Sequence, residues 1–179
     1  YDGANLISFY ALPGDVSVAG VFGNTGCDVI GVIGEGVGAV NLDGSWIGSL
    51  TEVAQDDGYW VKVSGDCTIA LDDSDPVNYD SDGEVSYDMH YGNNLISYSF
   101  ETAQSLDDAL GTAAGNVWAL AGEGVAALNT GDGWAGSLQA FEGGNGYWLV
   151  ATSDFEFSFN GTEAGLSRQA RQPELEPVP

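Results

Sequence analysis

The chain carries an internal repeat, and this feature limits its fold more than any other. Four short blocks occur twice in the same order, and three of them are separated by 88 residues. Ordered blocks at one offset indicate two copies of a single module, and a chain built from such copies is expected to fold into two similar halves. The paired blocks are Asn5–Ser8 with Asn94–Ser97, Gly34–Val37 with Gly122–Val125, Trp46–Leu50 with Trp134–Leu138, and Gly58–Trp60 with Gly146–Trp148.

The repeat also suggests where the modules begin and end. We predict a first module at 1–71, an acidic linker at 72–91, a second module at 92–161 and a Pro-rich C-terminal spacer at 162–179. Two small modules can pack about a pseudo-two-fold axis or stay apart like beads, and the repeat does not choose between these arrangements.

Each module is predicted to be β-rich, with antiparallel strands and one short helix. The 27 glycines are scattered among strand-like runs, which is typical of many tight turns. A strand is expected at Asn5–Tyr10 and a helix at Asp15–Phe22. In the second copy, Ser105 precedes the corresponding helix and can cap its N-terminus.

The rest of the module is predicted to form two hairpins. An apolar run at Val29–Val40 is expected to be one strand, joined to Trp46–Val53 by a turn at Asp43–Gly44. A second hairpin is expected to pair Gly58–Val63 with Thr68–Leu71. The fold class is therefore mainly β, or β-rich α+β.

The charge balance excludes several classes of partner. The chain has 27 acidic residues and three basic ones, a net charge of −24. Nucleic acids and anionic membrane surfaces are recognised by Lys and Arg, so neither is an expected partner. No apolar run is long enough to span a membrane. The acidic surface is typical of an extracellular protein kept soluble by its charge, and cation binding is the alternative interpretation.

The two cysteines indicate a disulfide. Cys27 and Cys67 both lie in the first copy, and their counterparts in the second are Gly115 and Phe155. Because both are missing together from the second copy, we expect them to pair with each other, and two free buried thiols are the alternative. A disulfide implies an oxidising compartment, so the chain is expected to be secreted or displayed at a cell surface.

One segment of the linker resembles the start of a calcium-binding loop. Oxygen-bearing side chains alternate along it and are followed by a glycine, as hard cations require. The match fails at its last position, where Met89 replaces the expected acid and Asp88 comes one residue early. An acidic turn leading into the second copy is the alternative. The candidate calcium ligands are Asn78, Asp80, Asp82, Glu84 and Asp88.

Catalytic motifs are scarce. His90 is the only histidine, and no phosphate-binding loop or dinucleotide fingerprint occurs. Glu35 and Glu123 recur between glycines, where a buried carboxylate is able to act as a general acid. Since both copies keep the same glutamate, it is more simply explained as an acceptor for backbone N–H groups. We therefore expect no enzymatic activity, and an acidic-residue hydrolase is the least favoured hypothesis.

The aromatic residues suggest a ligand site. Four of the five tryptophans are duplicated, which favours a role in the core. In each Gly-Tyr-Trp block the period of a strand puts Tyr and Trp on opposite faces, so one of the two is displayed. Trp118 has Ile30 as its counterpart and is therefore specific to the second copy. The candidate ligand-binding residues are Trp118, Tyr59 and Tyr147.

The ordered set Asn-Leu-Ile-Ser, Gly-Glu-Gly-Val, Trp-x-Gly-Ser-Leu and Gly-Tyr-Trp resembles tandem repeat modules in large secreted proteins of marine bacteria and their phages. The resemblance covers almost all of residues 3–161. It implies a secreted, multidomain context for a functionally uncharacterised module and supplies no catalytic residues.

Three functions follow in order of preference. The first is a non-catalytic extracellular structural or adhesive module that binds other copies of itself or other surface proteins. The second is a carbohydrate-binding module that uses displayed aromatic rings to bind glycans. The third is the hydrolase. Calcium is the only cofactor that the sequence suggests.

Overall fold

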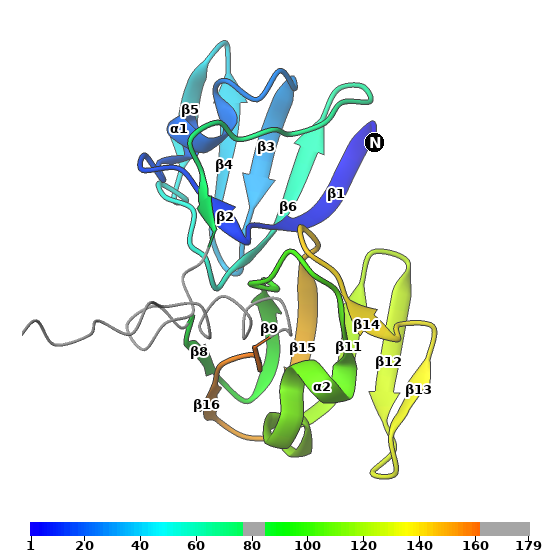
Figure 1. Ribbon diagram of the computed structural model, residues 1–179. Helices are drawn as coiled ribbons and strands as arrows, with labels where there is room; N and C mark the ends of the chain where they lie inside the picture. The colour runs from blue at the N-terminus through cyan, green and yellow to red at the C-terminus, as the bar shows by residue number, and fades with distance from the viewer. Residues whose placement is uncertain (77–84, 162–179) are drawn as a thin grey trace, which may run out of the picture.

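The computed structural model describes residues 1–76 and 85–161, and these residues form a mainly β protein with antiparallel sheets (Figure 1). The calcium-loop candidates Asn78, Asp80, Asp82 and Glu84, and the spacer at 162–179, lie outside the described residues.

The first half contains a five-stranded antiparallel sheet in the order β1-β6-β3-β4-β5. A short helix, α1, packs against one face of this sheet, which is called the inner face below. The elements are β1 (Gly3–Ser8), β2 (Ala11–Leu12), α1 (Val18–Phe22), β3 (Val29–Ile33), β4 (Gly38–Leu42), β5 (Ser45–Gly48), β6 (Gly58–Val63) and β7 (Asp75–Pro76).

The second half contains a sheet of the same kind, in the order β9-β15-β11-β12-β13 when it is read from the corresponding edge. Each of its strands corresponds in sequence to the strand at the same place in the first sheet, so the two sheets share one topology. The elements are β8 (Tyr87–Met89), β9 (Gly92–Ile96), β10 (Gln104–Ser105), α2 (Leu106–Leu110), the 3-10 helix η1 (Gly111–Asn116), β11 (Val117–Gly122), β12 (Val125–Asn129), β13 (Trp134–Gly136), β14 (Ala140–Phe141), β15 (Tyr147–Ala151) and β16 (Phe155–Phe157).

Local signals placed several elements correctly. The turn at Asp43–Gly44 has positive φ at both residues, 52° and 88°, which is the backbone of the two-residue hairpin turns that favour Asp-Gly. Ser17 and Ser105 cap the two short helices by accepting a hydrogen bond from the backbone N–H three residues later.

Two strand predictions were wrong. Val29–Val40 is not one strand, because it turns back at Gly34–Val37 and forms the hairpin of β3 and β4. Thr68–Leu71 is not a strand paired with β6, because β1 and β3 already occupy both sides of β6. In the second half, β16 pairs instead with β8, part of the segment predicted to be a linker.

Each half has its own hydrophobic core. The first core lies between the inner face of its sheet, including Val32 and Val61, and helix α1. The second core is more aromatic and takes in Val85, Tyr87 and Met89, so these three residues belong to the packed second half.

The two halves meet through reciprocal contacts. The N–H of Ser8 donates to the carbonyl of Gly144 at 2.9 Å, and the N–H of its counterpart Ser97 donates to the carbonyl of Asp56 at the same distance. Since Asp56 and Gly144 also correspond in sequence, every partner in one contact has its equivalent in the other. Such reciprocity is what a pseudo-two-fold axis produces, and it rules out two separate beads in this structure.

Glycine is needed at the centre of this junction. A Cβ on Gly58 would lie 2.7 Å from the carbonyl oxygen of Ile96, and one on Gly146 would lie 2.7 Å from that of Ile7. Real Cβ atoms do not approach a backbone oxygen so closely, so larger residues at either position would push the halves apart.

Candidate functional site

The duplicated glutamates lie at the junction between the halves. Glu35 Oε2 accepts the N–H of Leu95 at 2.8 Å, and Glu123 Oε2 accepts the N–H of Leu6 at 2.9 Å. Both glutamates follow the first strand of a hairpin and reach across to the other half. Both are exposed, so the interpretation as buried acids is wrong. Their role as acceptors for backbone N–H groups is the one that the contacts support.

His90 adds an asymmetric contact to this junction. Its Nε2 lies 2.7 Å from Glu35 Oε1, and its Nδ1 lies 2.9 Å from the carbonyl oxygen of Tyr91. The bond to the Tyr91 carbonyl and the bond to Glu35 raise the pKa of His90. Because the histidine has no counterpart histidine in the first half, only Glu35 gains this partner.

A second titratable group at the junction is Asp57, which forms a backbone bridge with Ile96. Desolvation of its carboxyl group, together with the charge of Asp56, raises the pKa of Asp57 to about 6. The hydroxyl of Tyr59 donates to Asp57 Oδ2 at 3.4 Å and opposes this rise. The carboxyl group therefore changes its charge close to neutral pH.

Tyr59 and Tyr147 are not available to a surface ligand. Their side chains are only 1% and 2% exposed, and their hydroxyl oxygens accept the N–H groups of Ala54 and Glu142, both at 2.8 Å. The prediction that these tyrosines contact a ligand is therefore wrong. Tyr and Trp do lie on opposite faces of each strand, as predicted, but the tyrosines lie on the inner face of each sheet.

The tryptophans divide between the two faces of the sheets. Trp46 and Trp134 pack against the two cores, as their duplication predicted. Trp60 and Trp148 are half-buried on the opposite, outer faces. Trp118 is 56% exposed and stands where the pairing of β11 with β15 is shifted by a bulge. It is the most exposed of the five tryptophans.

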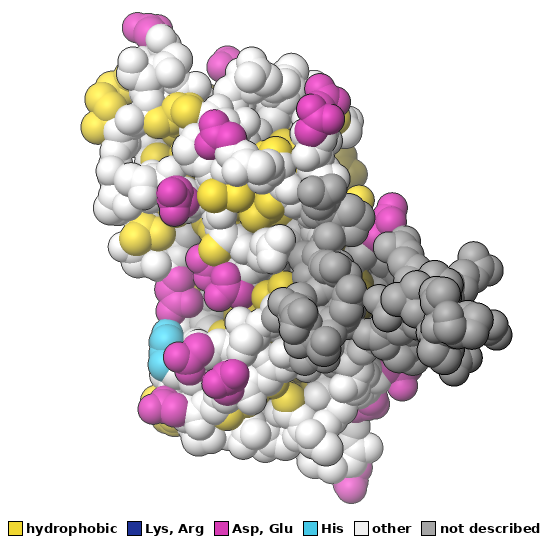
Figure 2. Space-filling model, turned by 60° about the vertical axis from the view of Figure 1, so that its left-hand side comes forward, with side chains coloured by type: hydrophobic (Ala, Val, Ile, Leu, Met, Phe, Trp, Pro, Cys, Tyr) yellow, Lys and Arg dark blue, Asp and Glu magenta, His cyan; other side chains and the backbone are white. Residues whose placement is uncertain are grey.

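The outer face of the first sheet carries an apolar surface that the sequence analysis missed. Four side chains there are at least half exposed, and they lie on three adjacent strands, β3, β4 and β5. Cross-strand pairing sets Val40 directly beside Ile47. Figure 2 shows hydrophobic side chains exposed at several places on the surface of the first half. The four residues, called the apolar face below, are Ile33, Val40, Leu42 and Ile47.

The apolar face is less developed in the second half. The counterpart of Val40 is Leu128, which is 42% exposed, but the counterparts of Ile33 and Ile47 are the small residues Ala121 and Ala135. A comparison of outward-facing positions between the two copies is the sequence signal that would have found the apolar face.

The calcium prediction is not supported by the part of the chain that the structure covers. Asp88 lies on β8, opposite Glu156 of β16. No group of three or more His, Cys, Asp or Glu side chains able to hold a metal ion occurs within residues 1–76 and 85–161. The other four candidate ligands, at 78, 80, 82 and 84, lie outside these ranges.

Cys27 and Cys67 lie at disulfide distance, with their Cα atoms 5.6 Å apart. The predicted pairing is confirmed, and the bond ties the loop before β3 to the segment after β6. None of the described helices is long and apolar enough to cross a membrane.

Comparisons of the chain with protein-family models, with curated proteins and with solved structures found no match.

Proposed function

We propose that the chain is a non-catalytic extracellular module with a structural or adhesive role, and that it associates with a second copy of itself through the apolar face. The observation that carries this proposal is the exposure of Ile33, Val40, Leu42 and Ile47 on adjacent strands. Contiguous apolar surface of this kind is typical of protein–protein contacts. The disulfide supports an extracellular location, since such bonds persist in oxidising compartments.

The position of β5 also favours association. It is an edge strand of the first sheet and carries Ile47 of the apolar face. The backbone groups on its outer side are able to pair with a strand of another chain. The net charge of −24 opposes close approach of two copies at low ionic strength. Association should therefore strengthen as salt screens this repulsion.

The proposal is tested by sedimentation velocity of the wild-type chain over a series of salt concentrations. We expect a concentration-dependent dimer that becomes more populated as salt is added. Val40→Asp should abolish it, because the substitution puts a charge at the centre of the apolar face. Leu128→Asp, at the corresponding position of the second sheet, is the matched control and should leave the dimer intact. A wild-type chain that stays monomeric at every salt concentration would contradict self-association.

Carbohydrate binding is the second candidate, and the exposure of Trp118 favours it. An exposed indole ring offers an apolar face on which a sugar ring is able to stack. Saturable binding on a glycan array that is lost in Trp118→Ala and kept in Leu128→Ala would support this function. Binding that survives Trp118→Ala would refute the role of Trp118 in glycan binding, on which this hypothesis rests.

A further inference from the structure

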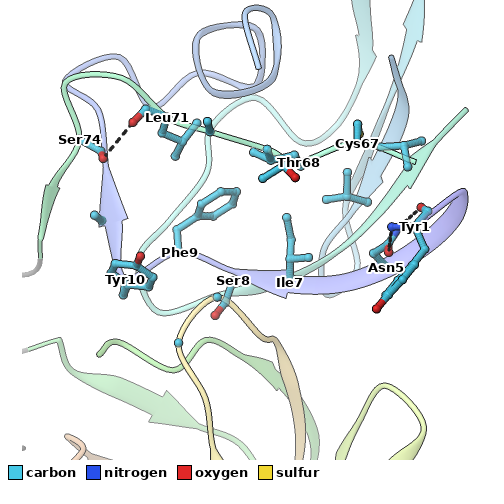
Figure 3. A pocket seen from close by; sticks show the side chains of 17 residues that line it. Tyr1, Asn5, Ile7, Ser8, Phe9, Tyr10, Cys67, Thr68, Leu71 and Ser74 are labelled. Atoms are coloured by element: carbon cyan, nitrogen blue, oxygen red, sulfur yellow. Dashed lines mark hydrogen bonds between the residues drawn. The ribbon is translucent and has the colours of Figure 1, made fainter. Parts of the chain in front are cut away.

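The first half contains an open cavity of about 650 Å³ beside the inner face of its sheet. Strands β1 and β6 form one wall, and the segment 67–71 forms the other. Figure 3 shows Ile7 of β1, and Phe9 just after this strand, pointing toward the segment that carries Thr68 and Leu71. The size of the cavity lies within the range of pockets that enclose a ligand.

The corresponding space in the second half is closed by strand β8. This strand pairs with β16, which corresponds in sequence to 67–69 in the first half. In the segment 85–89, which contains β8, the side chains of Val85, Tyr87 and Met89 point inward and are buried. Ser86 and Asp88, which lie between them, are exposed. An extended strand with apolar side chains at alternate positions therefore completes the second core.

Aromatic contacts hold β8 in place. The ring of Tyr87 lies 5.0 Å from that of Phe157 and 5.1 Å from that of Phe159, measured between centroids. The counterparts of these phenylalanines are Ile69 and Leu71, which line the cavity and are only half-buried. The residues that β8 covers in the second half thus have counterparts in the first half that no strand within residues 1–76 and 85–161 covers.

The hydrogen bonds at the entrance to this space are the same in both halves. Asn94 accepts the N–H of His90 at 3.0 Å and donates to its carbonyl at 2.8 Å. Asn5 accepts from the N-terminal amino group of Tyr1 at 2.9 Å and donates to its carbonyl at 2.8 Å. Tyr1 therefore occupies the position of His90, the residue that directly follows β8. The position of β8 itself corresponds to the open cavity beside Tyr1.

We propose that this cavity is a strand-accepting slot, and that its occupant is an extended segment of a partner polypeptide. The strand pairs antiparallel with 67–69, as β8 pairs with β16, and its C-terminal end lies beside Tyr1. No described residue of this chain fills the slot, and β8 is already paired within its own half. Strand addition of this kind takes its affinity from backbone hydrogen bonds and its specificity from alternate side chains.

The chemistry of the occupant follows from β8. Its inward positions should be apolar, with an aromatic residue at the central one, where Tyr87 stands in the second half. Its outward positions should be neutral or basic, because Asp2 and Asp66 lie close to this end of the sheet, where each accepts a backbone N–H. This slot is distinct from the apolar face, so the proposal does not depend on self-association through that face.

The test uses as a probe the peptide of residues 85–91 with Asp88→Asn, so that both outward positions are neutral, added to the ¹⁵N-labelled full chain. We expect saturable shifts of the amide signals of Ile7, Ile69 and Leu71, and exchange of the 67–71 amides that is at least ~10-fold slower. A peptide with Tyr87→Asp should not bind, because its charge would enter the centre of the slot. Shifts confined to β16, or none at all, would overturn the proposal.

Two variants of the chain locate the peptide. Ile69→Asp places a charge in the wall of the slot and should abolish binding, while Val40→Asp on the outer face is the matched control and should not. In a third variant, residues 85–89 are fused directly before Tyr1. This fused strand should protect the same amides and block the free peptide. If only the fused strand fills the slot, a partner chain as the source of the strand is refuted.

Discussion

The reciprocal glutamates at the junction give a sharp test of how the two halves hold together. Glu123 accepts the N–H of Leu6, and Glu35 accepts the N–H of Leu95. Replacing either glutamate with alanine leaves one backbone N–H in the other half without its acceptor. Leaving a buried donor unsatisfied costs about 1–3 kcal/mol. Since these glutamates are exposed and the contacts only partly buried, we expect a loss near the lower end, about 1–2 kcal/mol of unfolding free energy.

The measurement is amide hydrogen exchange, which reads the two contacts separately. In Glu123→Ala the amide of Leu6 should exchange about 5- to 30-fold faster, as 1–2 kcal/mol implies, while the amide of Leu95 keeps its protection. In Glu35→Ala the pattern should reverse. The glutamine variants are the matched controls, because the side-chain amide keeps an acceptor oxygen and should lose less protection.

Two outcomes would refute this reasoning. If Glu123→Ala leaves the Leu6 amide as protected as before, the hydrogen bond does not hold the junction. If both amides lose protection equally in each variant, the halves open as one unit and the contacts are not separable. Glu35→Ala also removes the contact of Glu35 with His90, but that contact is exposed and should add little.

Further predictions concern charge, the disulfide, the core and calcium. The raised pKa of Asp57 means that its contribution to stability is present below its ordinary pKa and is lost as pH rises through about 6. Melting temperature should therefore fall between pH 4 and pH 7, and Asp57→Asn should flatten that fall; an identical pH profile in the variant would contradict this. Reducing Cys27–Cys67 removes a cross-link that closes a loop of 40 residues, which should cost about 3–4 kcal/mol and speed exchange in β3 more than in β11. Equal effects on both strands would argue against a local role. Phe141→Ala should cost about 3–5 kcal/mol in urea unfolding, because its fully buried ring contacts three other aromatic rings. Trp118→Ala is its exposed control. If the segment 78–88 binds calcium, a chelator should lower the melting temperature, and an unchanged midpoint would exclude it.

Short-range signals predicted much of the fold because their physics is local. The turn at Asp43–Gly44 needs positive φ at both residues, and Ser105 needs only the N–H three residues ahead. The turn at Gly34–Val37 was missed because apolar residues flank it on both sides and hide the reversal. Gly36, which has φ of 69°, was the available signal.

Long-range pairing was harder to predict. A hairpin of Gly58–Val63 with Thr68–Leu71 looks reasonable from the local pattern, since Gly65 lies between them. The order of the sheet decides otherwise, because β1 and β3 take both sides of β6. The local sequence around the turn at Gly65 does not indicate that β6 pairs with β1, which lies more than fifty residues earlier in the chain.

Prediction of the candidate site from the sequence met a similar difficulty, because the sequence does not say which face of a strand lies outward. Alternation along a strand shows that Tyr59 and Trp60 face opposite ways, but both residues are aromatic, so polarity does not say which of them faces the core. The outward position of Ile33 was hidden for the same reason, since its neighbours in β3 are also apolar. Only the pairing of whole strands resolves the two faces.

The two halves hold the segment that follows β6 or β15 in different ways, and this difference explains how a slot is able to stay open. In the second half the segment at Phe155–Phe157 is held by pairing with β8 and by aromatic packing. In the first half the corresponding segment begins at Cys67, and the bond to Cys27 fastens it to the loop before β3. A covalent link restrains the segment without a neighbouring strand. The first half therefore keeps both walls of the slot in place while leaving the backbone of 67–69 free to pair.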